Sequence, residues 1–258
     1  MLKTSTFAVA LAALAAPALA SAAEPAPGPT PLAARNIIIV HDAFTDGSGW
    51  RAVHDILIRK GYHVKIVQES LTTLDEDVAA TREAVRAADG PVVLVGHGYG
   101  GTVITVAGAR DKVKALVYVA AVEPDVYENM AQLVGSMPAP SDDIRSTRDA
   151  HISFDSTRFA ADYAGDLPPS QSSFMAVSQP WATRAAIDGS PWQAIAWREK
   201  PTWAIVATED RALSPDLQRW MYNRADSKVT EVKASHAVYI SQPEAVAEVI
   251  EQAATSDK

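Results

Sequence analysis

The sequence predicts an α/β fold in which a mostly parallel sheet is covered by helices on both faces. Strand-like and helix-like segments alternate along the chain, and this alternation is typical of parallel sheets. One apolar run, Val92 to Val95, leads into a glycine-rich turn and then into a second apolar segment. The chain has 258 residues, of which 48% are hydrophobic. It is therefore long and apolar enough to form one domain with a substantial core.

The first half of the chain contains regularly spaced elements. We expect strands at residues 36–40, 63–67, 92–95 and 115–119, and helices at residues 50–60, 74–88 and 102–109. Gly61 is placed to end the first helix, and Asp89-Gly90-Pro91 ends the second. Parallel sheets bind ligands at the carboxyl ends of their strands. The loop that begins at His41 and the turn at Gly98 should therefore be neighbours in space.

The alternation is interrupted between about residues 123 and 200 and resumes afterwards. A strand at 202–207, a helix opened by Ser214 and Pro215, a strand at 228–232 and a helix at 243–252 complete the predicted fold. The interrupted region is rich in proline and in large apolar residues, namely Phe154, Phe159, Tyr163, Phe174, Met175, Trp181, Trp192 and Trp197. We interpret it as a helical lid in which Phe154, Phe174 and Trp181 contact a ligand. The alternative is a helical satellite that only packs on the sheet.

The N-terminus has the features of a secretory signal peptide. Lys3 supplies a positive start, residues 7–14 form a short apolar run, and Ala18-Leu19-Ala20 is a typical cleavage site. The run is too short for a membrane span, which needs about 20 residues. We therefore predict a signal peptide at 1–20, a proline-rich linker at 21–34 and a folded α/β domain at 35–258 that carries the insertion at about 123–200, exported to the periplasm or the medium after cleavage near Ala20. An uncleaved N-terminal anchor is the alternative.

Composition argues against several classes of partner and site. The formal net charge is −8, and the chain has no lysine or arginine cluster, which argues against binding nucleic acid or an anionic membrane. The absence of cysteine excludes disulfides, thiolate nucleophiles and cysteine-ligated metals. No His, Asp or Glu cluster has metal-ligand spacing along the sequence, so we expect no metal and no cofactor. The expected partner is a small-molecule substrate, and the sequence gives no oligomeric state.

The glycine-rich turn has the layout of a nucleophile elbow, in which Gly-x-Ser-x-Gly joins a strand to a helix. The serine position of that motif is Gly98 in the segment Gly96-His97-Gly98-Tyr99-Gly100-Gly101. With His41-Asp42-Ala43-Phe44 after the first strand, residues 35–253 resemble the α/β-hydrolase family. The likeness is to small bacterial members that carry His-Gly-Ala-Phe and Gly-His-Ser-Tyr-Gly-Gly.

This resemblance implies a set of site residues in the order nucleophile, acid, histidine. Gly98 stands at the nucleophile position, Asp210 at the acid position and His236 at the histidine position. The oxyanion hole would use the backbone N–H of Tyr99 and one from Ala43 or Phe44. Glu209 and Asp125 are alternative acids, and His97 and His41 are expected to be packed, hydrogen-bonded residues.

Two departures from the family pattern affect the chemistry. Gly98 has no side chain, so no acyl-enzyme can form there, and loss of a triad nucleophile costs on the order of a millionfold in turnover. Asp42 replaces a glycine, and a carboxylate about 4 Å from a developing oxyanion repels it by ~4 kcal/mol at an effective dielectric of 20. A non-glycine elbow residue is strained by ~1–3 kcal/mol. Gly98→Ser should therefore lower the melting temperature and create esterase activity.

Three functions are consistent with these residues. The first is an exported, esterase-like hydrolase of a small apolar or aromatic ester, with activity reduced or absent because Gly98 replaces the nucleophile. The second is a hydrolase fold that binds a ligand without catalysis. The third is an acid–base enzyme that uses Asp210 and His236 with no covalent intermediate, with Asp42 as a further acid–base group.

Overall fold

The computed structural model describes residues 1–2, 34–141, 143–192 and 195–256. The chain divides into two units, residues 1–31 and 32–258, and the fold below is that of the second. Nearly all of the predicted signal peptide and linker lies outside the described residues. Within the described part of the chain, no helix combines the length and the apolar character that crossing a membrane requires.

The core of the fold is a six-stranded, fully parallel sheet with the strand order β2-β1-β3-β4-β8-β9. Its strands are β1 (Asn36–Val40), β2 (His63–Val67), β3 (Val92–Gly98), β4 (Val113–Ala121), β8 (Thr202–Ala207) and β9 (Lys228–Val232). Four of the six have the bounds expected from sequence. Strand β3 is longer than expected because its pairing with β4 continues through His97 and Gly98, with a register shift between them.

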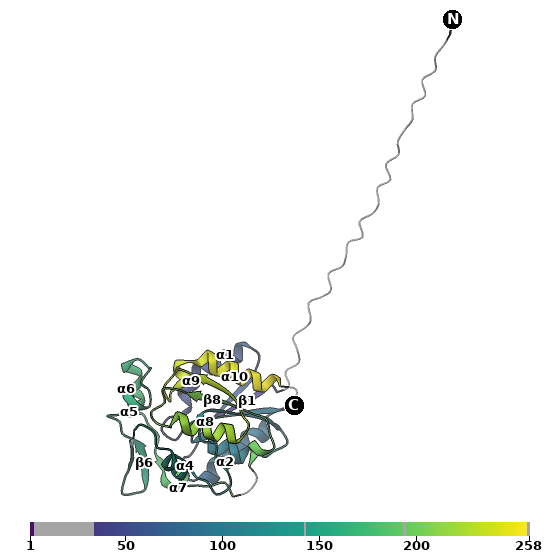
Figure 1. The fold of residues 1–258 in the computed structure, drawn as a ribbon. Coiled ribbons are helices and arrows are strands. Elements are labelled where there is room, and N and C mark those ends of the chain that lie inside the picture. The colour runs from purple at the N-terminus through teal and green to yellow at the C-terminus, as the bar shows by residue number, and fades with distance from the viewer. Residues whose placement is uncertain (3–33, 142, 193–194, 257–258) are drawn as a thin grey trace. The chain divides into compact units, whose positions relative to one another are not determined.

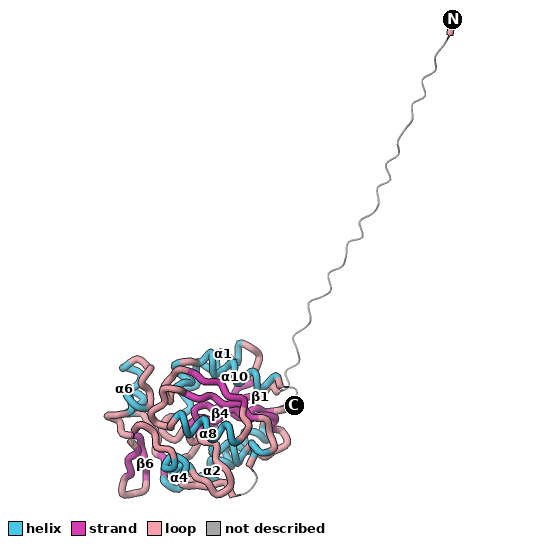
Figure 2. Tube along the Cα trace, in the orientation of Figure 1, coloured by secondary structure: helices cyan, strands magenta, loops and turns pink. Residues whose placement is uncertain are grey.

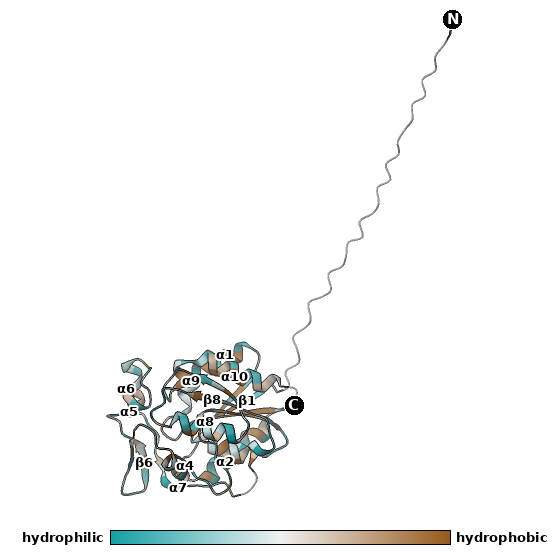
Figure 3. Ribbon diagram, in the orientation of Figure 1, coloured by the Kyte–Doolittle hydropathy of each residue, from teal (hydrophilic) through white to brown (hydrophobic). Residues whose placement is uncertain are grey.

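Helices cover both faces of the sheet, as predicted for this fold class (Figures 1 and 2). One face carries α1 (Arg51–Arg59) and α10 (Pro243–Thr255), and the other carries α2 (Leu74–Ala87), α3 (Gly100–Ala107) and α8 (Pro215–Arg224). Successive strand residues point to opposite faces. Ile37 and Ile39 accordingly join the cluster around Trp50, whereas Ile38 joins the cluster around Val103. Figure 3 shows the strands as an apolar layer between the helices.

Local signals set the helix ends. The Thr73 side chain accepts a hydrogen bond from the N–H of Glu76 at the start of α2, and Ser214 caps α8 in the same way. Gly61 follows α1 with a φ of +89°, which only glycine adopts without strain. A 3₁₀ turn, η1 (Gly47–Trp50), precedes α1, and a short helix, α9 (Val238–Ser241), follows β9. These caps explain why sequence located the helix ends closely.

The insertion between β4 and β8 differs from the expected set of helices. It contains a three-stranded antiparallel sheet of β5 (Ile144–Ser146), β6 (His151–Phe154) and β7 (Ala182–Thr183). Its helices are α4 (Met130–Ser136), α5 (Phe159–Asp162), α6 (Pro169–Val177), α7 (Arg184–Ile187) and the 3₁₀ turn η2 (Ala196–Arg198). Strands of two to four residues are too short to show a periodic pattern, which is why the sequence did not reveal them.

One segment of the insertion is joined to the sheet by polar contacts on two loops. Asp162, at the end of α5, pairs with Arg211 in the loop after β8, with 2.5 Å between its Oδ1 and the arginine Nε. Asp166 accepts from the N–H of Ser235 at 3.0 Å, in the loop after β9. The N–H of Ala237 donates to the carbonyl of Tyr163 at 3.1 Å. The segment 162–166 is therefore fixed over the carboxyl ends of β8 and β9.

The contact between Tyr222 and the end of β4 gives a test of the packing. The buried Tyr222 hydroxyl accepts from the N–H of Ala121 at 2.8 Å and donates to its carbonyl at 2.9 Å. Tyr222→Phe should lower the unfolding free energy by about 1–3 kcal/mol, because two buried backbone groups lose their partner. Urea denaturation measures this. The exposed Tyr127 is the control, and Tyr127→Phe should change stability by less than about 0.5 kcal/mol. Equal effects would contradict the assignment.

Candidate active site

The centre of the site is the sharp turn between β3 and α3. Gly98, the last residue of β3, has a φ of +52°, a backbone conformation that favours glycine. The turn is tightly packed, since a Cβ on Gly101 would lie 2.2 Å from the carbonyl oxygen of Val122. The N–H of Val122 donates to the carbonyl of Gly98 at 3.0 Å. The strand–turn–helix layout expected of an elbow is present in full, without a hydroxyl at its tip.

The side chain of Asp42 occupies the place that a residue-98 side chain would take. A Cβ built on Gly98 would lie 2.0 Å from Asp42 Oδ1. The same Oδ1 accepts the N–H of Tyr99 at 2.7 Å, and Oδ2 accepts the Tyr163 hydroxyl at 2.9 Å. Asp42 is 1% exposed. The carboxylate therefore uses the backbone donor that the family resemblance assigns to the oxyanion hole.

His236 and Asp210 meet above this turn, although they come from separate loops. His236 Nδ1 lies 2.7 Å from Asp210 Oδ2, and His236 Nε2 lies 3.8 Å from Asp42 Oδ2. Both side chains are buried. The imidazole thus lies between two carboxylates, one in the acid position and one beside Gly98.

Asp210 is held in place by further hydrogen bonds. Its Oδ1 accepts from the N–H groups of Ala212 and Leu213 at 2.9 and 2.8 Å. Its Oδ2 also accepts from the Gln218 side chain at 2.8 Å. The alternative acids lie elsewhere, because Glu209 is exposed and pairs with Lys233, and Asp125 pairs with Arg198. Asp210 is the acid that contacts His236.

The electrostatics favour a charged array, by which we mean the three buried side chains of Asp42, His236 and Asp210. Burial alone lowers the pKa of His236, but the negative charges of Asp210 and Asp42 outweigh it and raise the pKa to about 10. Burial alone raises the pKa of Asp42, but interactions with His236 and with the N–H of Tyr99 hold it well below its usual range. At neutral pH the array contains an imidazolium between carboxylates. Such an imidazolium donates a proton and does not accept one.

His97 lies against this array with one nitrogen unpartnered. Its Nε2 is 2.9 Å from the carbonyl oxygen of His236, which can only accept, so Nε2 carries the proton. Its Nδ1 is buried without a hydrogen-bond partner among the described residues. Burial and then the charge of His236 lower the pKa of His97 to about 3, so the ring is neutral.

Asp42, His97 and His236 also form a group that can hold a metal. Each offers one ligand atom, and these atoms lie within 4.8 Å of one another. Sequence spacing gave no sign of the group because its members lie far apart in the chain, Asp42 and His236 in loops and His97 in β3. The expectation of no metal rested on that spacing alone.

The loop after β1 is fixed by His41. The ring Nδ1 lies 2.8 Å from the carbonyl of Asp42, and Nε2 accepts from the N–H of Glu69 at 3.0 Å. Ala43 and Phe44 are buried beside it, and their N–H groups have no acceptor among the described residues. These are the second predicted oxyanion donors, and no other described group competes for them.

Sequence analysis missed a cluster of hydroxyl groups next to Asp42. The Tyr163 hydroxyl, which bonds to Asp42, lies 3.5 Å from Thr45 Oγ1, and the Tyr239 hydroxyl lies 3.4 Å from the same oxygen. Tyr163 was noted only as a large apolar residue of the insertion. Its hydroxyl is a polar group that must find a partner when buried, and that is the signal that could have drawn attention to it.

The three aromatic residues predicted to contact a ligand have different positions. Phe154 is buried and packs edge-on against Phe44 at 5.9 Å between ring centroids. Phe174 is exposed and lines a cavity of about 170 Å³ together with Thr45 and Tyr239. Trp181 is 74% exposed and contacts His151, so the structure does not bring it to the site. The spacing of aromatic residues did not distinguish an inward ring from an outward one.

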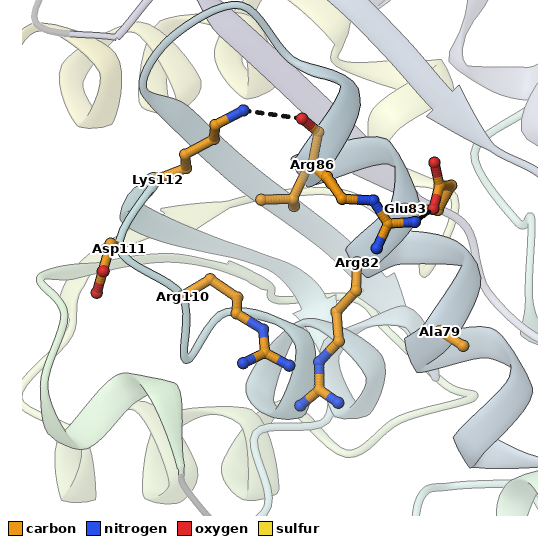
Figure 4. A pocket seen from close by; sticks show the side chains of 8 residues that line it. Ala79, Arg82, Glu83, Arg86, Arg110, Asp111 and Lys112 are labelled. Atoms are coloured by element: carbon orange, nitrogen blue, oxygen red, sulfur yellow. Dashed lines mark hydrogen bonds and ion pairs between the residues drawn. The ribbon is translucent and has the colours of Figure 1, made fainter.

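Figure 4 shows a second cavity, of about 620 Å³. It is lined by residues of α2 and of the loop that precedes β4, namely Ala79, Arg82, Glu83, Val85, Arg86, Arg110, Asp111 and Lys112. These flank the amino ends of the strands, whereas Gly98, Asp210 and His236 follow their carboxyl ends. The cavity is therefore separate from the site described above.

Comparison with known proteins places the chain among hydrolases. The profile of the alpha/beta hydrolase family matches residues 37–249. A pyrethroid hydrolase from Sphingobium wenxiniae is 26% identical over 246 residues, covering 83% of this chain and 86% of the relative. A crystal structure of a pyrethroid hydrolase is 25% identical, with a TM-score of 0.73 over 85% of this chain and 97% of that one. Polyneuridine aldehyde esterase, at 16% identity, shares the fold with a TM-score of 0.71 over 83% and 97%.

The charge state of His236 can be tested by its titration. A folded-state pKa of about 10 exceeds the unfolded value of about 6.5, so the proton stabilises the folded state. This stabilisation is complete below about pH 6.5 and is lost as the pH rises towards 10. Urea denaturation from pH 6 to 10 should show stability falling, by up to about 1.4 kcal/mol per pH unit for one proton.

NMR of the imidazole resonances provides the direct measurement. His236 should stay protonated at pH 8, and Asp42→Asn should lower its pKa by removing one of two neighbouring anions. The half-exposed His54 is the control, and His54→Gln should leave the titration of His236 unchanged. Titration of His236 near pH 6.5 in the unmodified protein would contradict the charged array.

Proposed function

The chain belongs to the alpha/beta hydrolase family, and we propose that it is an exported, esterase-like enzyme for small, uncharged esters with an apolar or aromatic group. The observation that carries this proposal is the Asp210–His236 pair held over the turn at Gly98, next to the N–H of Tyr99. In the family this arrangement serves hydrolysis of acyl compounds, and the acid, the histidine and the backbone donor of Tyr99 are all present here.

The surroundings of the site support a small, uncharged substrate. One cavity shares Thr45 and Tyr239 with the hydroxyl cluster beside Asp42 and is also lined by Phe174, Met175 and Ile240. Its volume of about 170 Å³ suits a small group. The named activity of the Sphingobium relative, pyrethroid hydrolysis, supports a small-molecule ester as the substrate.

The missing nucleophile limits this activity in the chain as it stands. Serine chemistry requires a hydroxyl at residue 98 and a free oxyanion donor, and here Asp42 occupies the space of the first and binds the second. The protonated state of His236 lowers serine-type activity further, because an imidazolium cannot act as a general base. We therefore propose low serine-type esterase activity in this form.

The same protonated state favours one further candidate, acid–base catalysis without a covalent intermediate. An imidazolium between two carboxylates can donate a proton to a leaving group at neutral pH. Asp42, 3.8 Å away, is the only second carboxylate that the described residues place beside His236 Nε2. In acid–base catalysis of this kind, Asp210 would still hold His236 in place. Gly98 would only leave space for the side chain of Asp42. Ligand binding without catalysis is the outcome if neither reaction is detected.

Substitutions at residues 98 and 42 test the esterase proposal. Gly98→Ser alone should lower the melting temperature and give little activity, because its Cβ would meet Asp42. This revises the expectation from sequence that the single substitution suffices. Gly98→Ser with Asp42→Gly should raise the hydrolysis rate of short p-nitrophenyl esters on the order of 10³-fold or more, since a nucleophile is worth on the order of 10⁶.

Two controls complete the assay. Asp42→Gly alone should not reach the rate of the double variant, because it frees the donor but supplies no nucleophile. His236→Ala in the double variant should remove the gain. A double variant that is folded, as judged by circular dichroism, and as inactive as the parent would reject the esterase proposal. Activity in the parent that His236→Ala abolishes would instead support the acid–base candidate.

Export is a separate proposal, carried by the sequence features of residues 1–20. Expression of the full chain in a Gram-negative host should place it in the periplasmic fraction, with a mass that corresponds to cleavage near Ala20. Replacing Ala18 and Ala20 with bulky residues should retain the uncleaved form. Recovery of the full-length, uncleaved wild-type chain from the cytoplasmic fraction would reject the proposal.

A further inference from the structure

We propose that Asp42, His97 and His236 bind a single divalent transition-metal ion of the Zn²⁺ type. The catalytic part of this inference rests on the proposed hydrolase function, in which the water bound to the ion replaces the missing serine hydroxyl. The binding part stands on the geometry of the three side chains alone.

The three ligand atoms are close to a coordinating arrangement. Because no two of them are more than 4.8 Å apart, all three lie within about 2.8 Å of a common centre, against the 2.0–2.2 Å typical of zinc bonds to nitrogen and oxygen. His236 Nε2 and Asp42 Oδ2 are 3.8 Å apart, and ligands of a tetrahedral zinc ion are separated by about 3.3 Å. Shifts of less than about 1 Å in each side chain would close the site.

The unpartnered nitrogen of His97 is an independent sign of a ligand. Its Nε2 carries the proton and faces a carbonyl, so Nδ1 holds a lone pair that is buried without a donor among the described residues. Buried polar atoms in native proteins nearly always have a partner. A cation at the centre of the group would supply one.

Each ligand also has the supporting contact that metal sites require. The second ring nitrogen of a metal-bound histidine usually donates to a carboxylate or a backbone carbonyl. His236 Nδ1 contacts Asp210, and His97 Nε2 contacts the carbonyl of His236. Asp42 is positioned by the N–H of Tyr99 and the hydroxyl of Tyr163. The outer contacts therefore leave His97 Nδ1 and His236 Nε2 without a hydrogen-bond partner, and Asp42 Oδ2, which accepts one hydrogen bond from Tyr163, keeps a second lone pair for an ion.

The charge balance favours a divalent ion. Two buried carboxylates, those of Asp42 and Asp210, lie beside the His236 ring at 3.8 and 2.7 Å. An ion of charge +2 held by neutral imidazoles would balance these two negative charges. Both carboxylates would therefore attract the ion.

The ligand types point to a class of metal. Two imidazole nitrogens and one carboxylate oxygen suit zinc, cobalt or iron, whereas magnesium and calcium prefer oxygen ligands alone. Three protein ligands leave at least one position open for water, which is the mark of a catalytic site. A structural site would have four.

Such an ion would supply the two functions that the family assigns to the serine hydroxyl and to the oxyanion donors. Held by Asp42, His97 and His236, it would lower the pKa of a bound water, which would lose a proton to solvent, and the resulting hydroxide would form a bond to the acyl carbon. The ion would also stabilise negative charge on the carbonyl oxygen. Breakage of the bond from the acyl carbon to the alkoxy oxygen would leave a carboxylic acid and an alkoxide, and transfer of the acid proton to the alkoxide through water would give a carboxylate and an alcohol. The donor of Tyr99 can remain on Asp42 throughout.

Metal titration of the purified chain tests the binding. After dialysis against a chelator, isothermal calorimetry with ZnCl₂ should show one ion per chain with a dissociation constant in the micromolar range or below. With CoCl₂, visible absorption should report coordination by nitrogen and oxygen. Asp42→Asn and His97→Gln should each weaken binding by about 100-fold or more, and Asp210→Asn, an outer contact, by about 10–100-fold.

His54→Gln is the matched control, because His54 and Asp55 form a histidine–carboxylate pair outside the group. It should leave the stoichiometry and affinity of the buried site unchanged. Asp42→Asn keeps the shape of the side chain, and circular dichroism verifies that each variant is folded. The absence of binding by the wild-type chain, or binding that Asp42→Asn and His97→Gln leave unchanged, an adventitious ion only, would overturn the proposal.

Activity measurements separate this inference from the proposed function. Ester hydrolysis that appears with Zn²⁺ and is lost in Asp42→Asn supports both. Hydrolysis by the Gly98→Ser, Asp42→Gly variant, with no metal binding by the wild-type chain, supports the hydrolase function and overturns the metal site. One bound ion per chain with no hydrolysis by any variant supports the metal site and rejects the esterase function.

Discussion

The site depends on one electrostatic constraint. Asp42, His236 and Asp210, the three residues of the charged array, are buried side by side in a single row. Buried charges are stable only when they are paired and hydrogen-bonded, and each member of this row meets that condition in its own way. Asp210 uses two backbone N–H groups and Gln218, and Asp42 uses Tyr99 and Tyr163. Removing any one member leaves an uncompensated charge in the interior, so the three residues act as a unit.

The fold supplies the positions that this row requires. The parallel sheet brings the loops after β1, β3, β8 and β9 to one edge, and the row is assembled from them. The insertion contributes Tyr163, which reaches Asp42 because the salt bridge of Asp162 with Arg211 and the hydrogen bond of Asp166 with Ser235 fix its backbone. The insertion therefore contributes a side chain to the site.

Much of this arrangement could be predicted from sequence. Apolar periodicity located β1, β2, β8 and β9, because buried parallel strands are continuous apolar runs or short alternating ones between clear turn signals. The family pattern identified Gly98, Asp210 and His236 because their order in the chain follows the strands. It did not reveal that Asp42 fills the space above Gly98 or that Tyr163 donates to it. Those contacts join residues from distant loops, and Trp181 points outward for reasons that only the packing of the insertion decides.

Gly98 and Asp42, the two departures from the family pattern, depend on each other. A side chain at residue 98 and the carboxylate of Asp42 cannot occupy the same volume, since only 2.0 Å separates the Cβ position from Oδ1. With glycine at residue 98, the carboxylate of Asp42 accepts the N–H of Tyr99 and forms an ion pair with His236 Nε2 at 3.8 Å. The exchange turns a neutral nucleophile site into an anionic one. In this form the site offers an anion and an imidazolium to a substrate, and a cation that replaced the imidazolium proton would meet the same carboxylates.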